Sequence, residues 1–491
     1  MRLSALGQIW FLESLACYVQ ASGAVVQAGG VEYHGLQNST ARINSFYGIR
    51  YASAPTSYLR WRPPVPIKTR SERVIIDARR RGPVCPQSYP PWTPAALSSA
   101  REDEDCLLLD IVAPTVATSD KLPVMVQIHG GGYVGGSAAS APGASLVHQA
   151  NGTLIYVAIQ YRLGPLGFLA GDQIAANGSW NGGLLDQRAA LDWVQQNIHF
   201  FGGDPEKVTI VGGSAGGASA SLQMMIYHSG DFAYGTYYWG PAVDGHILHE
   251  RPLEAFSRGH FHKVPILINR DGNEGFTFSN TSIATEDEVI SDLKCSWPNE
   301  TFLAESLTLY PGLLYNTSMI EDLTAIQALE AASGVDLPLS NAFVQRESLF
   351  GDALVNCPTR YIAEAASKAE LATYKMVFDS GIQFHGSTQQ FLYSDTVNPT
   401  GDTSFGSVTI PGNGTLAIIM RDYFISFAVT LDPNSALSSS RARPVWPGYQ
   451  STNDTTAILR VQNNGITISK DPDINAHCQW LAFSAPYLER I

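Results

Sequence analysis

The chain has few charged side chains for its length. Only 15% of its 491 residues are Asp, Glu, Lys or Arg, whereas an ordinary globular domain has about 25%. The 31 basic residues against 44 acidic ones leave a formal net charge of −13. A protein that binds a phosphate backbone needs clustered cations, so this balance argues against nucleic acid as a partner. With 45% hydrophobic residues, the chain has enough apolar material for a large packed core.

The sequence also lacks a long unbroken apolar run and a cysteine pattern typical of metal sites. The uncharged stretch 122–161 is interrupted by glycines and a proline, so it cannot form one membrane-spanning helix. The six cysteines show no Cys-x-x-Cys or Cys/His spacing, so no zinc or other metal site is expected. We find neither an internal repeat nor a low-complexity linker.

The N-terminal residues 1–24 resemble a secretory signal peptide. Met1 and Arg2 precede a mostly apolar stretch, which ends in small residues up to Ala24. Glu13 interrupts that stretch, so a buried N-terminal helix stays an alternative. Glycan on asparagine is expected to solubilise the surface of an exported, extracellular protein, because eight Asn-x-Ser/Thr sites begin at Asn38, Asn151, Asn177, Asn280, Asn299, Asn316, Asn413 and Asn453.

The cysteine count agrees with export. Removal of the signal peptide with Cys17 leaves five cysteines, at positions 85, 106, 295, 357 and 478. Five is an odd number, so at most two internal disulfides form and one thiol is left over. Several pairings are compatible with the sequence alone.

Four short runs rich in β-branched residues predict buried strands, at 124–128, 154–159, 208–211 and 264–268. Between the second and third runs, residues 181–200 have the apolar spacing of a helix and end at a Gly-Gly-Asp-Pro stop signal. This alternation predicts an α/β fold with a mostly parallel sheet and helices on both faces. Such sheets place their chemistry at the carboxyl ends of the strands.

The third run is followed by a Gly-x-Ser-x-Gly sequence centred on Ser214. Between a strand and a helix, this pattern holds the serine on a sharp turn, where neighbouring backbone leaves no room for Cβ atoms. The N-terminus of the following helix, expected at 218–227, directs its dipole toward the serine. The pentapeptide alone also fits an ordinary glycine turn, but its place between a predicted strand and helix favours a nucleophile.

The first run is followed by His129-Gly-Gly-Gly-Tyr133. Three consecutive glycines are compatible with a flexible turn. They also suit an oxyanion hole, because residues without side chains let backbone N–H groups reach a tetrahedral intermediate. The coincidence of two such motifs at the ends of two predicted strands favours the catalytic interpretation of both.

With further motifs, the chain resembles the type-B carboxylesterase/lipase family of α/β-hydrolases, which includes cholinesterases and secreted fungal lipases. The resemblance runs from about Val31 to Trp480 and implies one α/β-hydrolase domain over residues 25–491, although the length alone would allow about three domains. It implies no metal or organic cofactor. The motifs that carry it are Phe46–Ala52, Leu59–Pro64, Glu104–Asp110, Tyr161–Phe168 and Asn181–Arg188.

The resemblance assigns the remaining catalytic roles. The order in this fold is serine, acid, histidine, which gives Ser214 as nucleophile, Glu274 as acid and His385 as base. Asp271 competes with Glu274 for the role of the acid, but the Glu-Gly pair fits the family pattern better. His129, His228 and His246 are expected to be structural or exposed. The oxyanion hole is expected to consist of the N–H groups of Gly131, Gly132 and Ala215.

The family also suggests the disulfides Cys85–Cys106 and Cys357–Cys478, with Cys295 unpaired. The first would close a loop of 20 residues that forms a lid over the acyl site in lipase relatives. Here the loop looks short and its second half is polar, which favours an esterase acting on soluble or small esters over a lipase activated at an oil surface. Trp92 in this loop fits either a cationic-substrate site or simple packing.

The sequence departs from the family after the nucleophile helix. Only residues 231–239 separate the expected end of that helix from the next family motif, where relatives have a strand and several helices. A βαβ unit takes roughly 30 residues, so the sheet is expected to lack a segment here, and its neighbours would pair across the gap or expose their edges. An altered gene model is favoured over a tolerated deletion.

These observations lead to three functional hypotheses. The leading one is a secreted serine esterase that hydrolyses a small-molecule or lipid ester. The second is a non-catalytic family member that acts as a binding module, and the third is an inactive product of an altered gene model. The acyl and alcohol groups and the oligomeric state do not follow from the sequence.

Overall fold

A computed structural model of the chain describes residues 23–488, apart from 68–72, 89–100, 226–239, 298, 321–325, 328–329, 332–336, 395–402, 406–407, 411, 436–441 and 451–455. The expected lid residues from 89 to 100, with Trp92, lie outside the described residues, as does the short segment 231–239. The predicted signal peptide also lies outside them, except for Gly23 and Ala24, which begin the first strand.

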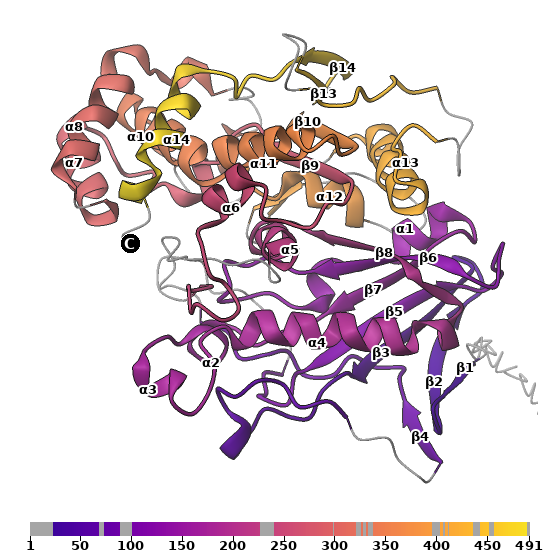
Figure 1. Cartoon of the computed structure of the whole chain (residues 1–491). Helices are drawn as coiled ribbons and strands as arrows, with labels where there is room; N and C mark the ends of the chain where they lie inside the picture. The colour runs from indigo at the N-terminus through magenta and orange to yellow at the C-terminus, as the bar shows by residue number, and fades with distance from the viewer. Residues whose placement is uncertain are drawn as a thin grey trace, which may run out of the picture.

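The larger sheet has eight strands and crosses the N-terminal half of the molecule (Figure 1). Neighbours are antiparallel from β1 to β7, whereas β6 lies parallel to both β7 and β8. β4 (Val74–Asp77) pairs with β2 at the side. The main order is β1 (Gly23–Ala28), β2 (Val31–Asn38), β3 (Ile43–Arg50), β5 (Leu108–Pro114), β7 (Ile155–Ile159), β6 (Leu122–Ile128) and β8 (Gly203–Gly212).

A second sheet belongs to the C-terminal half and has the order β14 (Gly465–Lys470), β13 (Ala457–Gln462), β10 (Thr373–Asp379) and β9 (Ile266–Asp271). In this sheet β9, β10 and β13 are parallel and β14 is antiparallel. The short strands β11 (Thr403–Phe405) and β12 (Val408–Ile410) form a separate pair. Among the described residues, β8 pairs only with β6 and β9 only with β10. The predicted lack of a segment at 231–239 stays a prediction.

Helices cover both faces of the larger sheet, as predicted. Because successive side chains of a strand point to opposite faces, Val124 and Val126 belong to the core under α4 (Gly182–Asn197) and α5 (Ala215–Met225). Met125 lies on the other face, in the core shared with α1 (Ala144–Ala150) and α13 (Gly414–Thr430). The predicted helix at 181–200 is thus α4, and its buried stripe includes Leu184 and Val194.

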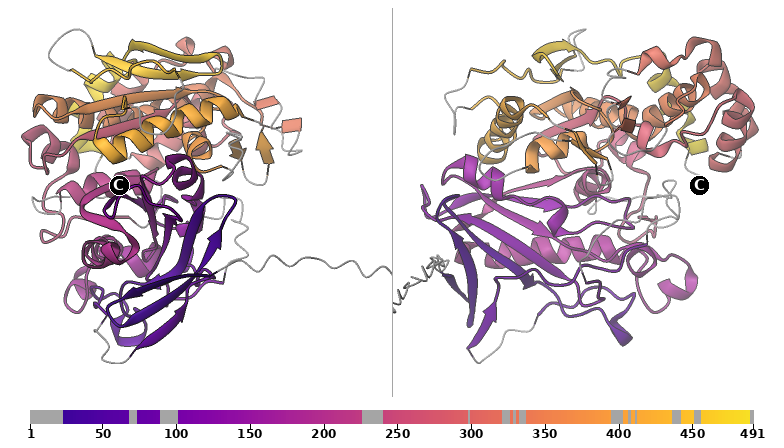
Figure 2. Two further views of the ribbon diagram at one scale, coloured as in Figure 1. Left: turned by 90° about the vertical axis from the view of Figure 1, so that its right-hand side faces the viewer. Right: turned by 180° about the vertical axis from the view of Figure 1, so that it is seen from behind.

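The two views of Figure 2 show the N-terminal half below and the C-terminal half above. A further core joins α7 (Glu286–Ser296), α8 (Glu300–Leu309), α10 (Asn341–Gly351), α11 (Cys357–Lys368) and α14 (Ala476–Leu488). The shorter helices are α2 (Gly164–Phe168), α3 (Asp172–Ala175), α6 (Pro252–Arg258) and α12 (Ser387–Tyr393). In the described part of the chain, no helix is long and apolar enough to cross a membrane.

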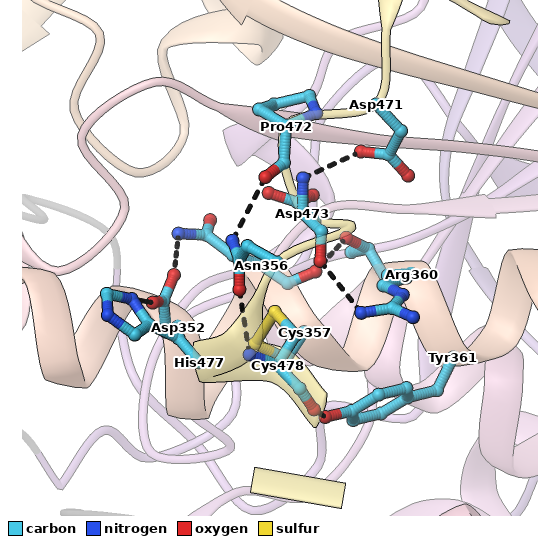
Figure 3. Close-up of a disulfide and its surroundings, with 12 residues drawn as sticks. Asp352, Asn356, Cys357, Arg360, Tyr361, Asp471, Pro472, Asp473, His477 and Cys478 are labelled. Carbon is cyan, nitrogen blue, oxygen red and sulfur yellow. Dashed lines mark hydrogen bonds and ion pairs between the residues drawn. A yellow bond between two sulfur atoms is a disulfide. The ribbon is translucent and has the colours of Figure 1, made fainter. Parts of the chain in front are cut away.

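Both expected disulfides are present. Cys85 and Cys106 have Cα atoms 5.0 Å apart, those of Cys357 and Cys478 are 5.1 Å apart, and Cys295 is free and exposed. Figure 3 shows the second bridge between the start of α11 and α14, where Asp352 accepts a hydrogen bond from Asn356 and lies 3.2 Å from the His477 ring nitrogen. This bridge ties the helical core to the C-terminal helix.

Candidate active site

Ser214 occupies the turn between β8 and α5. Its φ of +56° lies in the left-handed region, which a residue with a side chain adopts only when its surroundings impose it. The neighbouring glycines explain how the turn fits: a Cβ on Gly216 would lie 2.0 Å from the carbonyl oxygen of Ile128, and one on Gly212 would lie 2.3 Å from that of Gly216. The close approach of these backbones therefore requires glycine at both positions, as a nucleophile elbow does.

The glycine turn after β6 lies against this elbow. A Cβ on Gly130 would be 2.6 Å from the Gly213 carbonyl oxygen and 3.0 Å from the Cβ of Ser214. Gly131 and Gly132 have φ values of +108° and +60°, which residues with side chains rarely adopt. The structure therefore brings the two glycine motifs together at the carboxyl ends of β6 and β8, as predicted for parallel neighbours.

His129 has the structural role expected from the sequence. The residue is 2% exposed, and its ring stacks on Tyr161 at a centroid distance of 4.4 Å and places Nδ1 2.8 Å from the Gly130 carbonyl oxygen. Burial disfavours the charged imidazolium and lowers the pKa of His129 to about 4. The ring is therefore neutral at physiological pH and supports the glycine turn. Of the other two histidines set aside, His246 is exposed and His228 lies outside the described residues.

Glu274, in the turn that follows β9, contacts His385, in the loop between β10 and α12. The Glu274 carboxylate contacts His385 Nδ1, and its other oxygen accepts the backbone N–H of Asp271 at 2.6 Å. The Glu274 side chain is 3% exposed and that of His385 15%. Burial alone would lower the pKa of His385, but the charge and hydrogen bond of Glu274 and the charge of Asp271 outweigh it, so this pKa lies above its ordinary value.

The loop before His385 is joined to the acid turn by backbone and ring contacts. Asn273 donates its backbone N–H to the Gln383 carbonyl at 2.9 Å and forms a β-bridge with Phe384. The Phe276 and Phe384 rings stack with centroids 3.8 Å apart, and Phe278 lies 4.8 Å from the His385 ring. These contacts explain how residues more than a hundred positions apart in the sequence form one site.

Asp271, the competing candidate for the acid, makes different contacts. Its carboxylate accepts the backbone N–H groups of Gly386 at 2.7 Å and Thr388 at 3.1 Å, and the Thr388 hydroxyl. It thus binds Gly386 and the first turn of α12, whereas Glu274 contacts the His385 ring itself. The sequence offers no signal for this contact, because the two acids stand three residues apart on one turn.

The histidine loop also lies close to the elbow. A Cβ on Gly213 would be 2.0 Å from Nε2 of Gln389, which belongs to α12, the helix that follows His385. His385 Nε2 is buried and has no hydrogen-bond partner among the described residues. In that same part of the chain, no hydrogen bond joins Ser214 to His385. Such bonds are often long in free enzymes and tighten when substrate binds.

Comparison with known proteins places this chain in a family. The carboxylesterase family matches residues 25–234 and 230–478. The chain belongs to the carboxylesterase family. Its members hydrolyse carboxylic esters, so the protein is a carboxylic ester hydrolase, as predicted. The point where the two matched parts meet falls in the segment 226–239, which lies outside the described residues.

Individual relatives agree with this assignment. Secreted lipase 1 of Botryotinia fuckeliana is 41% identical over 518 residues, which cover 83% of this chain and 84% of the lipase. Carboxylesterase patB of Penicillium expansum is 33% identical and covers 88% of this chain and 90% of that protein. The crystal structure of Aspergillus niger EstA superposes with a TM-score of 0.78 at 23% identity, over 96% of this chain and 99% of EstA, which confirms the α/β-hydrolase fold.

Proposed function

We propose that this carboxylesterase is a secreted serine esterase with the triad Ser214, His385 and Glu274. The observation that carries the proposal is the contact between Glu274 and His385 Nδ1. This contact fixes the imidazole tautomer and leaves Nε2 as the basic nitrogen for a serine hydroxyl. The elbow that holds Ser214 lies beside α12, which directly follows this histidine.

In the first half of the reaction, Ser214 Oγ attacks the ester carbonyl carbon while His385 Nε2 takes the hydroxyl proton. The carbonyl oxygen becomes an oxyanion, which the backbone N–H groups of Gly131, Gly132 and Ala215 stabilise, and one such donor contributes about 3–4 kcal/mol. The bond to the alcohol oxygen then breaks, and the alcohol leaves with the proton from His385. Ser214 keeps the acyl group.

In the second half, His385 takes a proton from water, whose oxygen attacks the acyl carbon. The second tetrahedral intermediate collapses, the bond to Ser214 Oγ breaks, and the proton returns from His385 to the serine. Glu274 keeps its negative charge throughout and stabilises the transient imidazolium. These steps use only side chains, backbone N–H groups and water.

The relatives support both the substrate class and export. Carboxylesterases and lipases are among them, and two of the lipases are named as secreted, which agrees with the predicted signal peptide. We therefore propose a small-molecule or lipid ester as substrate and an extracellular site of action. The preference for soluble esters over an oil surface stays a prediction, because most of the lid loop lies outside the described residues.

Covalent labelling tests the proposed nucleophile. A fluorophosphonate probe is expected to label the wild-type protein and to leave Ser214→Ala unlabelled, since the probe reacts with an activated serine. Ser219→Ala is a matched control, because this serine is buried on the same helix α5, and it should be labelled like the wild type. Equal labelling of Ser214→Ala would contradict the proposal. An unlabelled wild-type protein would favour the binding module or the inactive product.

The pH profile tests the proposed base. His385 must be neutral to accept a proton, so kcat/KM is expected to fall as pH drops through its pKa. Because the pKa of His385 is raised, the midpoint of this fall should lie above the ordinary value of about 6.5. The measurement is kcat/KM for a 4-nitrophenyl ester from pH 5 to 9. A flat profile between pH 5 and 8 would contradict the assignment of His385.

A further inference from the structure

The carboxylate of Asp271 is buried at the end of β9, beside the proposed triad. The residue is 3% exposed, and its two oxygens accept three hydrogen bonds from Gly386 and from Thr388 in the first turn of α12. One oxygen accepts the backbone N–H of Gly386, and the other accepts both the N–H and the hydroxyl of Thr388. None of the steps described above uses this carboxylate.

We propose that Asp271 is a positioning residue, whose carboxylate holds the segment 385–388, from His385 into the first turn of α12, so that the His385 ring lies between Glu274 and Ser214. This inference rests on the proposed function, because it assumes that His385 is the base. Gly386 shows why an anchor is needed: its φ is +94° and a Cβ there would meet no neighbouring atom within 4 Å. The backbone next to the histidine therefore has the freedom of glycine, and no side chain at this position adds packing that would restrain it.

Asp271 makes hydrogen bonds both to the proposed acid and to the residue next to the proposed base. Its backbone N–H donates to Glu274 Oε1, while its side chain accepts from the loop that carries His385. The acid is thereby oriented by the amide of Asp271 and the base by its carboxylate. A displacement of about 1 Å at a reacting group costs on the order of 100-fold in rate, so loss of this double contact should reduce turnover.

The charge of Asp271 also acts on His385. It is one of the two carboxylates that raise the pKa of this histidine, the other being Glu274. Two more charged groups interact with Glu274, namely Glu347 on α10 and Arg270 on β9. Burial and the neighbouring Glu274 raise the pKa of Asp271 itself to about 7. At pH 8 and above the carboxylate is mainly ionised and accepts its three hydrogen bonds.

The decisive variant is Asp271→Asn, which keeps the size of the side chain but removes the charge and one acceptor. We expect kcat at pH 8.5 to fall about 10- to 100-fold and the acid limb of the pH profile to move to lower pH. Thr388→Val removes the hydroxyl, which donates to Asp271 and accepts from the Asn269 side chain at 3.2 Å, but it leaves the charge of Asp271 in place. It should therefore reduce kcat less and leave the acid limb where it is. A purely structural role for Asp271 would reduce activity without moving the profile.

Two matched controls separate these effects from general damage. Asp204→Asn removes a buried aspartate that accepts a backbone N–H at the start of β8, the end of the strand opposite to Ser214. Thr373→Val removes a buried threonine hydroxyl that donates to the Leu371 carbonyl. Both should keep the wild-type kcat and the wild-type pH profile. Circular dichroism of all variants establishes that they are folded.

NMR titration of the His385 ring in the full-length protein gives a readout that needs no turnover. We expect a lower pKa for His385 in Asp271→Asn than in the wild type. An unchanged pKa together with wild-type kcat would overturn the inference, as would a reduced kcat with an unchanged profile. If Asp271→Asn does not fold, wild-type kcat in Thr388→Val overturns it. Failure of the proposed function itself would appear separately, as equal probe labelling of Ser214→Ala and the wild type.

Discussion

Glu274→Gln is expected to lower kcat by about 10⁴-fold, with little change in KM. The glutamine amide cannot supply the negative charge that stabilises the imidazolium, and its NH₂ group favours the tautomer with the proton on Nε2. That tautomer cannot accept the proton of Ser214. The 3% exposure of the Glu274 side chain strengthens the effect, because water cannot replace the lost charge.

Steady-state hydrolysis of a 4-nitrophenyl ester at pH 8.5 measures this effect. The matched control is Glu347→Gln, a half-buried glutamate, which interacts with the Gly275 backbone next to Glu274. In the described part of the chain, no hydrogen bond or ion pair joins Glu347 to the His385 ring, whose Nδ1 contacts Glu274, so its replacement should change kcat by less than about tenfold. Equal losses in the two variants would mean that the buried charge matters in general and that Glu274 is not the acid of the triad.

The strands next to the candidate site were predictable from short apolar runs in the sequence. Residues 124–128 lie in β6, 155–159 form β7 and 208–211 lie in β8. The first two runs are buried on both faces, and such strands are hydrophobic without interruption, whereas residues 208–211 are half-buried. The antiparallel strands at the N-terminal edge, β1 to β3, carry no such run. Their partly exposed faces mix polar and apolar residues, so periodicity alone does not single them out.

The site itself was predictable to different degrees. Ser214 is identified by a local pattern, because its turn needs glycines on both sides. Glu274 and His385 are far apart in the sequence, and only family resemblance pairs them. The role of Asp271 could not be predicted from the sequence. Its neighbourhood suggested an alternative acid, whereas its carboxylate contacts the loop backbone at Gly386 and Thr388, which no residue pattern encodes.

The pairing of the disulfides does not follow from the residue pattern either. The five cysteines after residue 24 allow several pairings, and the spacing of Cys357 and Cys478, 121 residues apart, does not indicate a contact. The bridge depends on the docking of α14 against α11, which is a tertiary event. The sequence does indicate that one thiol stays unpaired, since the count is odd, and Cys295 is free in the structure.

Asp186→Ala is expected to cause the largest loss of stability among single changes near the site. Asp186 on α4 is fully buried and forms a two-pronged pair with Arg162, with both nitrogen–oxygen distances 2.7 Å. It also accepts the backbone N–H of Arg162 at 3.0 Å. Removing the carboxylate leaves a buried guanidinium without its partner, which costs about 3–5 kcal/mol in free energy of unfolding. Urea denaturation followed by tryptophan fluorescence measures the change.

The double variant Arg162→Met/Asp186→Leu identifies the cause of that loss. If the cost comes from the uncompensated charge, replacing both partners by apolar residues should recover most of the stability lost in Asp186→Ala. Asp77→Ala is the surface control, because its pair with Arg79 is more than half exposed on both sides, and its urea midpoint should hardly move. A double variant no more stable than Asp186→Ala would show that the backbone contact to Arg162, and not the buried charge, holds the loop after β7 on α4.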